Sequence, residues 1–223
     1  MMKKLSVILA LICSITIFAQ NKINEGVVTS VQKMSSPNPE VSAQLAMVGD
    51  VVTITEFKKN KSRAQMASIM MGNTTTVLDA DVNKMLVLSD NPTMGKTFTL
   101  KDIKDDQVDL DKFEIIKGEN TKTVLGYECQ EYIVTTSQQG AQMKMTVFTT
   151  ESVEAQSQQI KAMGSKLKGY PMYMKIEMNQ QGMDMVIESE VTKIEEKRIE
   201  DNVFSLEIPE GYKEAQMPVK DGQ

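Results

Sequence analysis

The feature that most constrains this chain is an alternation of apolar and polar side chains with a period of two residues. In VVTITEF (51–57), the odd-numbered positions fall on one side and the even-numbered positions on the other. Similar stretches separated by short polar turns run from residue 25 to residue 208. Successive side chains of a β-strand point to opposite faces, so this period predicts strands. The short turns between them predict that the sheet is antiparallel.

The first residues have the pattern of an export signal. MMKK is basic, the apolar run LSVILALICSITIF follows it, and Ala19 offers a small residue for cleavage. The run is shorter than the ~20 residues that a membrane-spanning helix needs. We therefore expect a signal peptide over residues 1–19, one β domain over 20–214 and a flexible tail over 215–223. The protein is then periplasmic or envelope-located, with no stable membrane span.

Composition argues against several kinds of chemistry. The chain contains no histidine, which removes histidine-dependent nucleophile pairs, HExxH zinc sites and imidazole proton shuttles. Cys13 lies in the predicted signal, so Cys129 has no partner for an intramolecular disulfide. The net charge of −5 becomes −7 when Lys3 and Lys4 leave with the signal. An acidic chain of this kind predicts no nucleic-acid partner and weak attraction to anionic membranes.

Two helices are predicted among the strands. In residues 37–49, Asn38 can cap a helix, Pro39 suits its first position and Gly49 suits its end. A second helix is predicted over residues 151–164, ending at the glycine there. Each has one apolar face, so both are expected to pack on the sheet.

Two segments share the letters QQG followed by methionines at alternate positions. They are TSQQGAQMKMTVF (136–148) and MNQQGMDMVI (178–187). A four-residue loop around each QQG predicts two similar hairpins, each with one apolar side. The predicted register pairs Met178 with Met183, Ile176 with Met185, Met174 with Ile187, Val134 with Met143, and Tyr132 with Met145.

The methionines admit three interpretations. They can pack the core, they can continue the core into a groove for an apolar ligand, or they can bind Cu(I), which thioethers favour. The absence of histidine weakens the copper interpretation, and we assign no metal ligands and no cofactor. The candidate wall of a ligand groove is Met172, Met174, Ile176, Met178, Met183, Met185, Ile187, Met143 and Met145.

Catalytic motifs are present only in part. SVQK (30–33) and SKLK (165–168) fit the S-x-x-K motif of penicillin-binding proteins, and SDN stands at 89–91. The third motif of that set is missing, because Phe98 follows Lys96-Thr97. Ser30 also falls in a predicted strand, whereas the nucleophile of that set begins a helix. We attribute the matches to chance, predict no catalytic residue and expect no enzyme.

Two further candidates favour structural interpretations. DADVNK (79–84) has the spacing of the start of a calcium loop, but Lys84 stands where the loop needs glycine. The segment is predicted to be a hairpin turn. Cys129 has no histidine to lower its pKa and lies in an alternating stretch, so we expect a small buried residue.

Four segments resemble a known family. They are PNPEVSAQLAM (37–47), GYECQEYIV (126–134), LKGYPMYMKIEM (167–178) and FSLEIPEGYK (204–213). Together they are similar to domain-of-unknown-function family 4412, exported bacterial proteins grouped with the LolA/LolB lipoprotein-carrier-like fold. The resemblance implies a mainly β, strongly curved, unclosed antiparallel sheet with about two short helices on its concave side. It also implies a Gram-negative cell envelope.

The resemblance and the methionines lead to a functional expectation. We expect a binding protein without catalytic activity that holds an apolar ligand, a lipid or a lipoprotein acyl chain, in the concavity of the sheet. Two alternatives stay open at this point: methionine-based handling of Cu(I), and an envelope interaction module without a small ligand. The oligomeric state does not follow from the sequence.

Overall fold

The computed structural model describes residues 22–68, 72–103, 113–138, 141–157, 160, 163, 166–180 and 183–215. The predicted signal peptide and nearly all of the predicted tail lie outside these residues. Twelve strands form one sheet in the order β12-β6-β5-β4-β3-β2-β1-β11-β10-β9-β8-β7. The strands are β1 (Glu25–Ser35), β2 (Val51–Lys58), β3 (Lys61–Ser68), β4 (Gly72–Asp79), β5 (Lys84–Asn91), β6 (Gly95–Asp102), β7 (Glu114–Val124), β8 (Tyr127–Gln138), β9 (Ala141–Thr150), β10 (Tyr170–Gln180), β11 (Met183–Glu196) and β12 (Lys213–Glu214).

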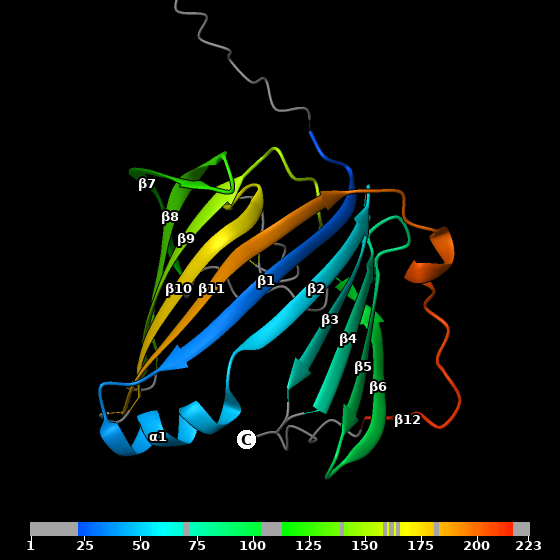
Figure 1. Ribbon diagram of the computed structural model, residues 1–223, viewed down its shortest axis with the longest axis horizontal. Helices are drawn as coiled ribbons and strands as arrows, with labels where there is room; N and C mark the ends of the chain where they lie inside the picture. The colour runs from blue at the N-terminus through cyan, green and yellow to red at the C-terminus, as the bar shows by residue number, and fades with distance from the viewer. Residues whose placement is uncertain are drawn as a thin grey trace, which may run out of the picture.

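The sheet curves into an open half-barrel, with β1, β2 and β11 at its centre and β7 and β6 toward its two sides (Figure 1). All neighbouring strands are antiparallel except β12 and β6, which pair in parallel. The predicted curved and unclosed antiparallel sheet is thereby confirmed, with this short parallel pair added at one edge. Tight turns join most strands: between β7 and β8, Leu125 and Gly126 both have positive φ, as a two-residue hairpin loop requires.

The first predicted helix is confirmed as α1 (Pro39–Val48). Asn38 caps it by accepting hydrogen bonds from the backbone N–H groups of Glu40 and Val41. Gly49 follows its last residue with a φ of 70°. The helix lies across the lower end of the sheet, between the end of β1 and the start of β2 (Figure 1), and none of its residues is fully buried.

The second predicted helix does not begin where the sequence pattern placed it. Val153 forms a parallel bridge with Ile23. The N–H of Ile23 donates to the carbonyl of Ser152, and the N–H of Glu154 donates to the carbonyl of Ile23, both at 2.8 Å. These bonds use backbone groups that a helix would need for itself. Residues 158, 159, 161, 162 and 164 of the predicted helix lie outside the described residues.

Both QQG hairpins are present, but their registers differ from the prediction by two residues. Met178 lies opposite Met185 rather than Met183, and Val134 lies opposite Met145 rather than Met143. Each loop has two residues, not four, because Gln180 pairs with Met183 and Gln138 pairs with Ala141. A shift of two residues keeps every side chain on its predicted face, since the period of a strand is two.

Three clusters of buried side chains hold the sheet. Two lie on its concave side and include Phe57, Tyr170 and Met172 in one and Tyr132, Val134 and Met145 in the other. The third lies on the convex side, where Val27, Val77 and Leu86 are covered by Ile199 and Phe204 of the chain after β11. We call residues 197–214 the C-terminal strap; it runs along the outside of the half-barrel to β12 (Figure 1).

Candidate functional site

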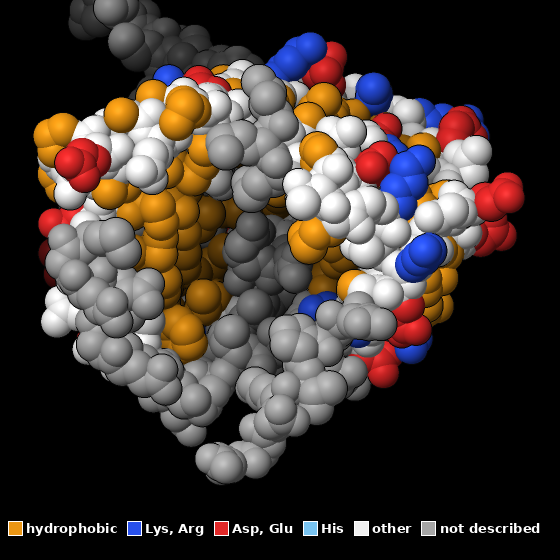
Figure 2. Space-filling model, turned by 90° about the horizontal axis from the view of Figure 1, so that it is seen from below, with side chains coloured by type: hydrophobic (Ala, Val, Ile, Leu, Met, Phe, Trp, Pro, Cys, Tyr) orange, Lys and Arg blue, Asp and Glu red, His pale blue; other side chains and the backbone are white. Residues whose placement is uncertain are grey.

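The concave face has two halves of different chemistry. Seen from below, hydrophobic side chains gather on one wall of a hollow in the half-barrel (Figure 2). That wall is formed by β8–β11, and we call it the methionine wall. The facing half, formed by β1–β5, carries mainly serine, threonine and other small side chains on its inner positions.

Strand register explains the methionine wall. Met178 lies between Met143 and Met185 on neighbouring strands, and Ile176 lies between Met145 and Ile187. The next row pairs Met174 with Val147 and Ser189. Residues that pair directly and share a face have Cβ atoms about 4.5–5.5 Å apart. The wall is therefore a set of parallel rows of thioether and branched side chains.

The structure places the nine candidate wall residues at different depths. Met172 is fully buried and Met145 is 4 % exposed, so both belong to the hydrophobic core. Met143, Met174, Ile176, Met178, Met185 and Ile187 are half-buried, and of Met183 only the backbone of β11 is described. Contact of these residues with a ligand stays a prediction.

Part of the methionine wall is covered by the chain itself. Ile160 and Leu167, from the segment between β9 and β10, pack against Tyr132, Val134 and Val147. The same segment reaches the opposite half, where the hydroxyl of Ser62 donates to the carbonyl of Gln156 at 3.1 Å. The concave face is therefore filled where this segment crosses it and recessed beside the segment.

One recess, of about 430 Å³, lies over the inner face of β1–β5. We call it the hydroxyl pocket. None of the described residues that line it is charged. The lining residues are Ser30, Gln32, Thr53, Thr55, Ser62, Ala64, Met66, Thr74, Thr76, Leu78, Val87, Gln156, Ser157, Tyr170, Pro171, Met174 and Ser189.

The hydroxyl pocket stays neutral over the physiological pH range. Burial raises the pKa of Tyr170 to about 12, although a hydrogen bond with Thr55 opposes this shift. The phenol therefore remains protonated. Met174 belongs to both the pocket and the methionine wall, so a ligand can contact an uncharged polar surface and an apolar one at once.

The sequence contained a signal for this pocket that the prediction did not use. Thr53 and Thr55, and again Thr74 and Thr76, stand at alternate positions of their strands. Threonine favours strands, so such pairs are easily assigned to strand propensity alone. Only the curvature of the sheet turns these positions toward a common recess.

A second recess, of about 960 Å³, lies at the lower end of the two QQG hairpins. Three of the predicted wall residues line it: Met143, Met178 and Met185. Residues whose side chains point to the other face of the sheet also line it, among them Glu177 and Lys144. Because both faces contribute, this recess lies at the rim of the sheet. The other apolar residues of its described lining are Pro37, Phe113 and Val186.

The structure describes the surroundings of Ser30 and Cys129, two of the residues considered as catalytic candidates. Ser30 lines the hydroxyl pocket, whose described lining contains no lysine. Ser165 lies outside the described residues. Cys129 is fully buried, its thiol donates to the carbonyl of Tyr127, and burial raises its pKa. Asp79 accepts hydrogen bonds from the backbone N–H groups of Asp81 and Val82 in the turn between β4 and β5, where the sequence predicted a hairpin turn.

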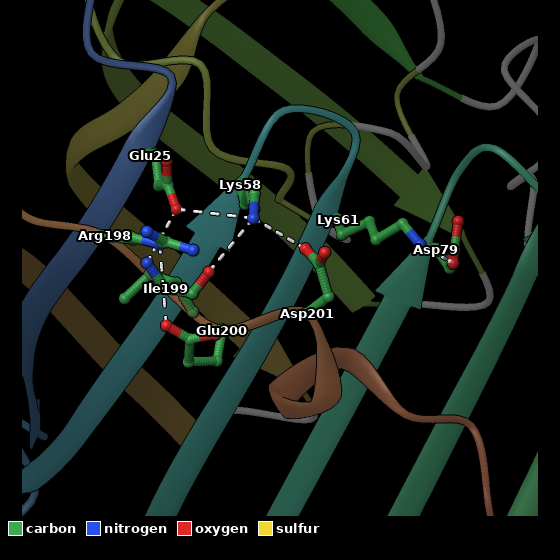
Figure 3. Close-up of polar contacts among 8 residues, drawn as sticks. All are labelled: Glu25, Lys58, Lys61, Asp79, Arg198, Ile199, Glu200 and Asp201. Carbon is green, nitrogen blue, oxygen red and sulfur yellow. Dashed lines mark hydrogen bonds and ion pairs between the residues drawn. The ribbon is translucent and has the colours of Figure 1, made fainter.

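Charged contacts hold the C-terminal strap against the convex face (Figure 3). The Lys58 ammonium donates to Asp201 at 2.7 Å and to the carbonyl of Ile199 at 3.2 Å. Glu25 accepts from the N–H of Ile199 at 2.7 Å. The bond with Asp201 raises the pKa of Lys58, and the bond with Lys58 lowers the pKa of Asp201.

In the part of the chain that the structure describes, no helix has the length and apolar character needed to cross a membrane.

Similarity to solved structures is weak. A structure of PNGF-II matches 85 % of this chain with a TM-score of 0.46 and 16 % identity, and the match covers 32 % of that chain. This chain thus spans about a third of the length of PNGF-II. The Mycobacterium tuberculosis lipoprotein LppX matches 79 % of this chain and 89 % of its own, with a TM-score of 0.34 and 7 % identity. No curated protein sequence matches the chain.

A family model gives a clear assignment. The model described as "Domain of unknown function (DUF4412)" matches residues 25–212, which include every strand except β12. The resemblance inferred from the four sequence segments is confirmed by this match. The chain belongs to the DUF4412 family.

Proposed function

We propose that this protein is a non-enzymatic binding protein of the cell envelope that holds an amphiphilic lipid, or the acyl chain of a lipoprotein, in its half-barrel. The observation that carries the proposal is the junction of the hydroxyl pocket with the methionine wall at Met174. An acyl chain fits against the wall, and an uncharged polar group such as a glyceryl ester fits among the hydroxyls.

The chemistry of both surfaces supports this ligand class. Methionine is unbranched and polarizable, so half-buried methionines adapt to apolar chains of different shape. The uncharged pocket lining offers hydrogen bonds without an ionic partner, which favours a neutral head group over a phosphate or carboxylate. Ligand sites of this kind are mostly apolar with a few polar groups that fix orientation.

A matched pair of variants of β3 tests the proposal. Ala64 lines the hydroxyl pocket, whereas Ala67 is exposed on the opposite face of the same strand. Ala64→Phe is expected to fill the pocket and weaken binding of a fluorescent monoacylglycerol by about tenfold or more. Ala67→Phe is expected to bind as the unchanged protein does.

Native mass spectrometry and lipid extraction of protein purified from the envelope identify the ligand. A protein that is always empty and takes up neither monoacylglycerol nor fatty acid would contradict the proposal and favour an interaction module. Tighter binding of the fatty acid than of the monoacylglycerol would contradict the assignment of a neutral head group.

A further inference from the structure

The row formed by Met143, Met178 and Met185 differs from the other rows of the methionine wall. Met178 pairs directly with Met143 on one side and with Met185 on the other. Three thioethers therefore stand side by side on the concave face of β9, β10 and β11. In the next row, two of the three corresponding positions are Ile176 and Ile187.

The geometry lets the three sulfur atoms approach a common point. Neighbouring strands lie about 4.8 Å apart, and paired side chains on one face begin at a similar spacing. The concave curvature of the sheet tilts the inner side chains toward one another. Each methionine also has three rotatable bonds, so its sulfur can move toward the central side chain without moving the backbone.

The surroundings of the row suit a small cation. All three side chains are half-buried, and all three line the 960 Å³ recess at the lower end of the hairpins. Acidic side chains that border the recess outnumber basic ones: Glu114, Glu177 and Asp184 against Lys144. The row is thus reachable from solvent and lies in a region of net negative charge.

We infer that Met143, Met178 and Met185 form a three-thioether site for a soft monovalent cation, Cu(I) or its analogue Ag(I). Thioethers are soft ligands that select Cu(I) and bind hard divalent cations poorly. If these three positions only packed against one another, branched side chains such as Ile176 and Ile187 of the next row would serve equally well. The three residues belong to the rim end of the methionine wall but share none with the hydroxyl pocket, so metal binding can be tested separately from lipid binding.

The chemistry of the site gives it a pH signature. A thioether carries no titratable proton, whereas histidine and cysteine ligands must lose one before they bind metal. The chain has no histidine, and Cys129 is buried away from the recess. Binding of Ag(I) is therefore expected to vary little between about pH 5 and pH 8.

Anaerobic titration of the full-length protein with Cu(I), in competition with a colorimetric Cu(I) chelator, tests the site. One equivalent is expected to bind, with only sulfur neighbours in the X-ray absorption spectrum. Met178→Leu, which keeps the volume of the side chain, is expected to lower the affinity about tenfold or more. Met94→Leu is the matched control, because Met94 is 75 % exposed and lies outside the row.

The outcomes separate the site from its alternatives. Absence of stoichiometric Cu(I) and Ag(I) binding overturns the inference, as does unchanged affinity in Met178→Leu. An equal loss in Met94→Leu points to scattered surface methionines and also overturns it. Loss of binding in Cys129→Ala with Met178→Leu unaffected assigns the metal to the thiol instead. Circular dichroism of each variant establishes that the sheet is intact.

Discussion

Burial differs among residues that the sequence pattern treats alike. Met172 and Met174 are two positions apart on the same face of β10, yet Met172 is fully buried and Met174 is half-buried. Met172 packs in a cluster with Phe57 and Tyr170, whereas Met174 borders the hydroxyl pocket. The same residue type therefore belongs to the core at one position and borders the hydroxyl pocket two positions later.

Alanine substitutions measure this difference. Met172→Ala is expected to lower the free energy of unfolding by about 2–5 kcal/mol, because it leaves a cavity in a closed core. Met174→Ala is expected to cost only about 1 kcal/mol, since the side chain is partly in contact with solvent. Denaturant unfolding compares the two variants, and equal losses would mean that the pocket beside Met174 is closed.

At the scale of elements, an ionic contact joins the start of the C-terminal strap to β2. The Lys58 ammonium is shared by Asp201, Glu25 and the carbonyl of Ile199. Beyond this contact, Phe204 packs on the convex face and Ala215 donates from its N–H to the carbonyl of Phe98 at 2.8 Å. The strap is thus attached at both ends.

The pKa shifts give the pH range in which the contact acts. Folding lowers the pKa of Asp201, so its contribution is present above the usual carboxyl pKa and is lost as the pH falls through the lower folded value. Folding raises the pKa of Lys58, so its contribution is lost only as the pH rises above the usual lysine range. Asp201→Asn should therefore lower the unfolding temperature at pH 7, and this difference should shrink as the pH falls toward 2.

A second acidic residue of the strap provides the control. The Asp201 side chain is 82 % exposed, but that of its partner Lys58 is only 24 % exposed. In contrast, Glu200 pairs with Arg198 at 3.6 Å, and both of these side chains are more than two-thirds exposed. Exposed pairs of this kind contribute little to stability. Glu200→Gln is expected to leave the unfolding temperature unchanged at both pH values. A pH-independent loss in Asp201→Asn would show that the ionic contact is not the cause.

At the scale of the whole molecule, the half-barrel presents two unlike surfaces to one space. The core clusters lie where the segment before β10 crosses the concavity and where the strap covers the outside. The hydroxyl pocket and the recess at the QQG hairpins lie beside these covered regions and not beneath them. Binding in the concavity can therefore add contacts without displacing the core.

A bound amphiphile is expected to stabilise the folded protein as a whole. At a free concentration one hundred times its dissociation constant, the expected gain is about 2.7 kcal/mol. Thermal unfolding with increasing monoacylglycerol should show a transition temperature that rises with the logarithm of concentration. The same titration with Ala64→Phe should show a much smaller rise, and an equal rise in both proteins would place the ligand elsewhere.

The sequence by itself determined the strand faces, the first helix and the family. The alternation predicted that the wall residues lie on one side of their hairpins. That prediction is correct although both predicted registers were wrong by two residues, because a shift of two residues leaves each side chain on the same face. The cap at Asn38 and the stop at Gly49 located α1, since capping is local chemistry.

Only the tertiary structure decided the features that require contacts between segments far apart in the sequence. Val153 forms a β-bridge where the periodicity predicted a helix, because the backbone of Ile23 bonds to the residues on either side of Val153. The tertiary structure buried Met172 and left Met178 half-buried, and it gathered threonines from separate strands into one uncharged pocket. Curvature and strand pairing set these neighbours, and neither property is encoded within any single stretch of the chain.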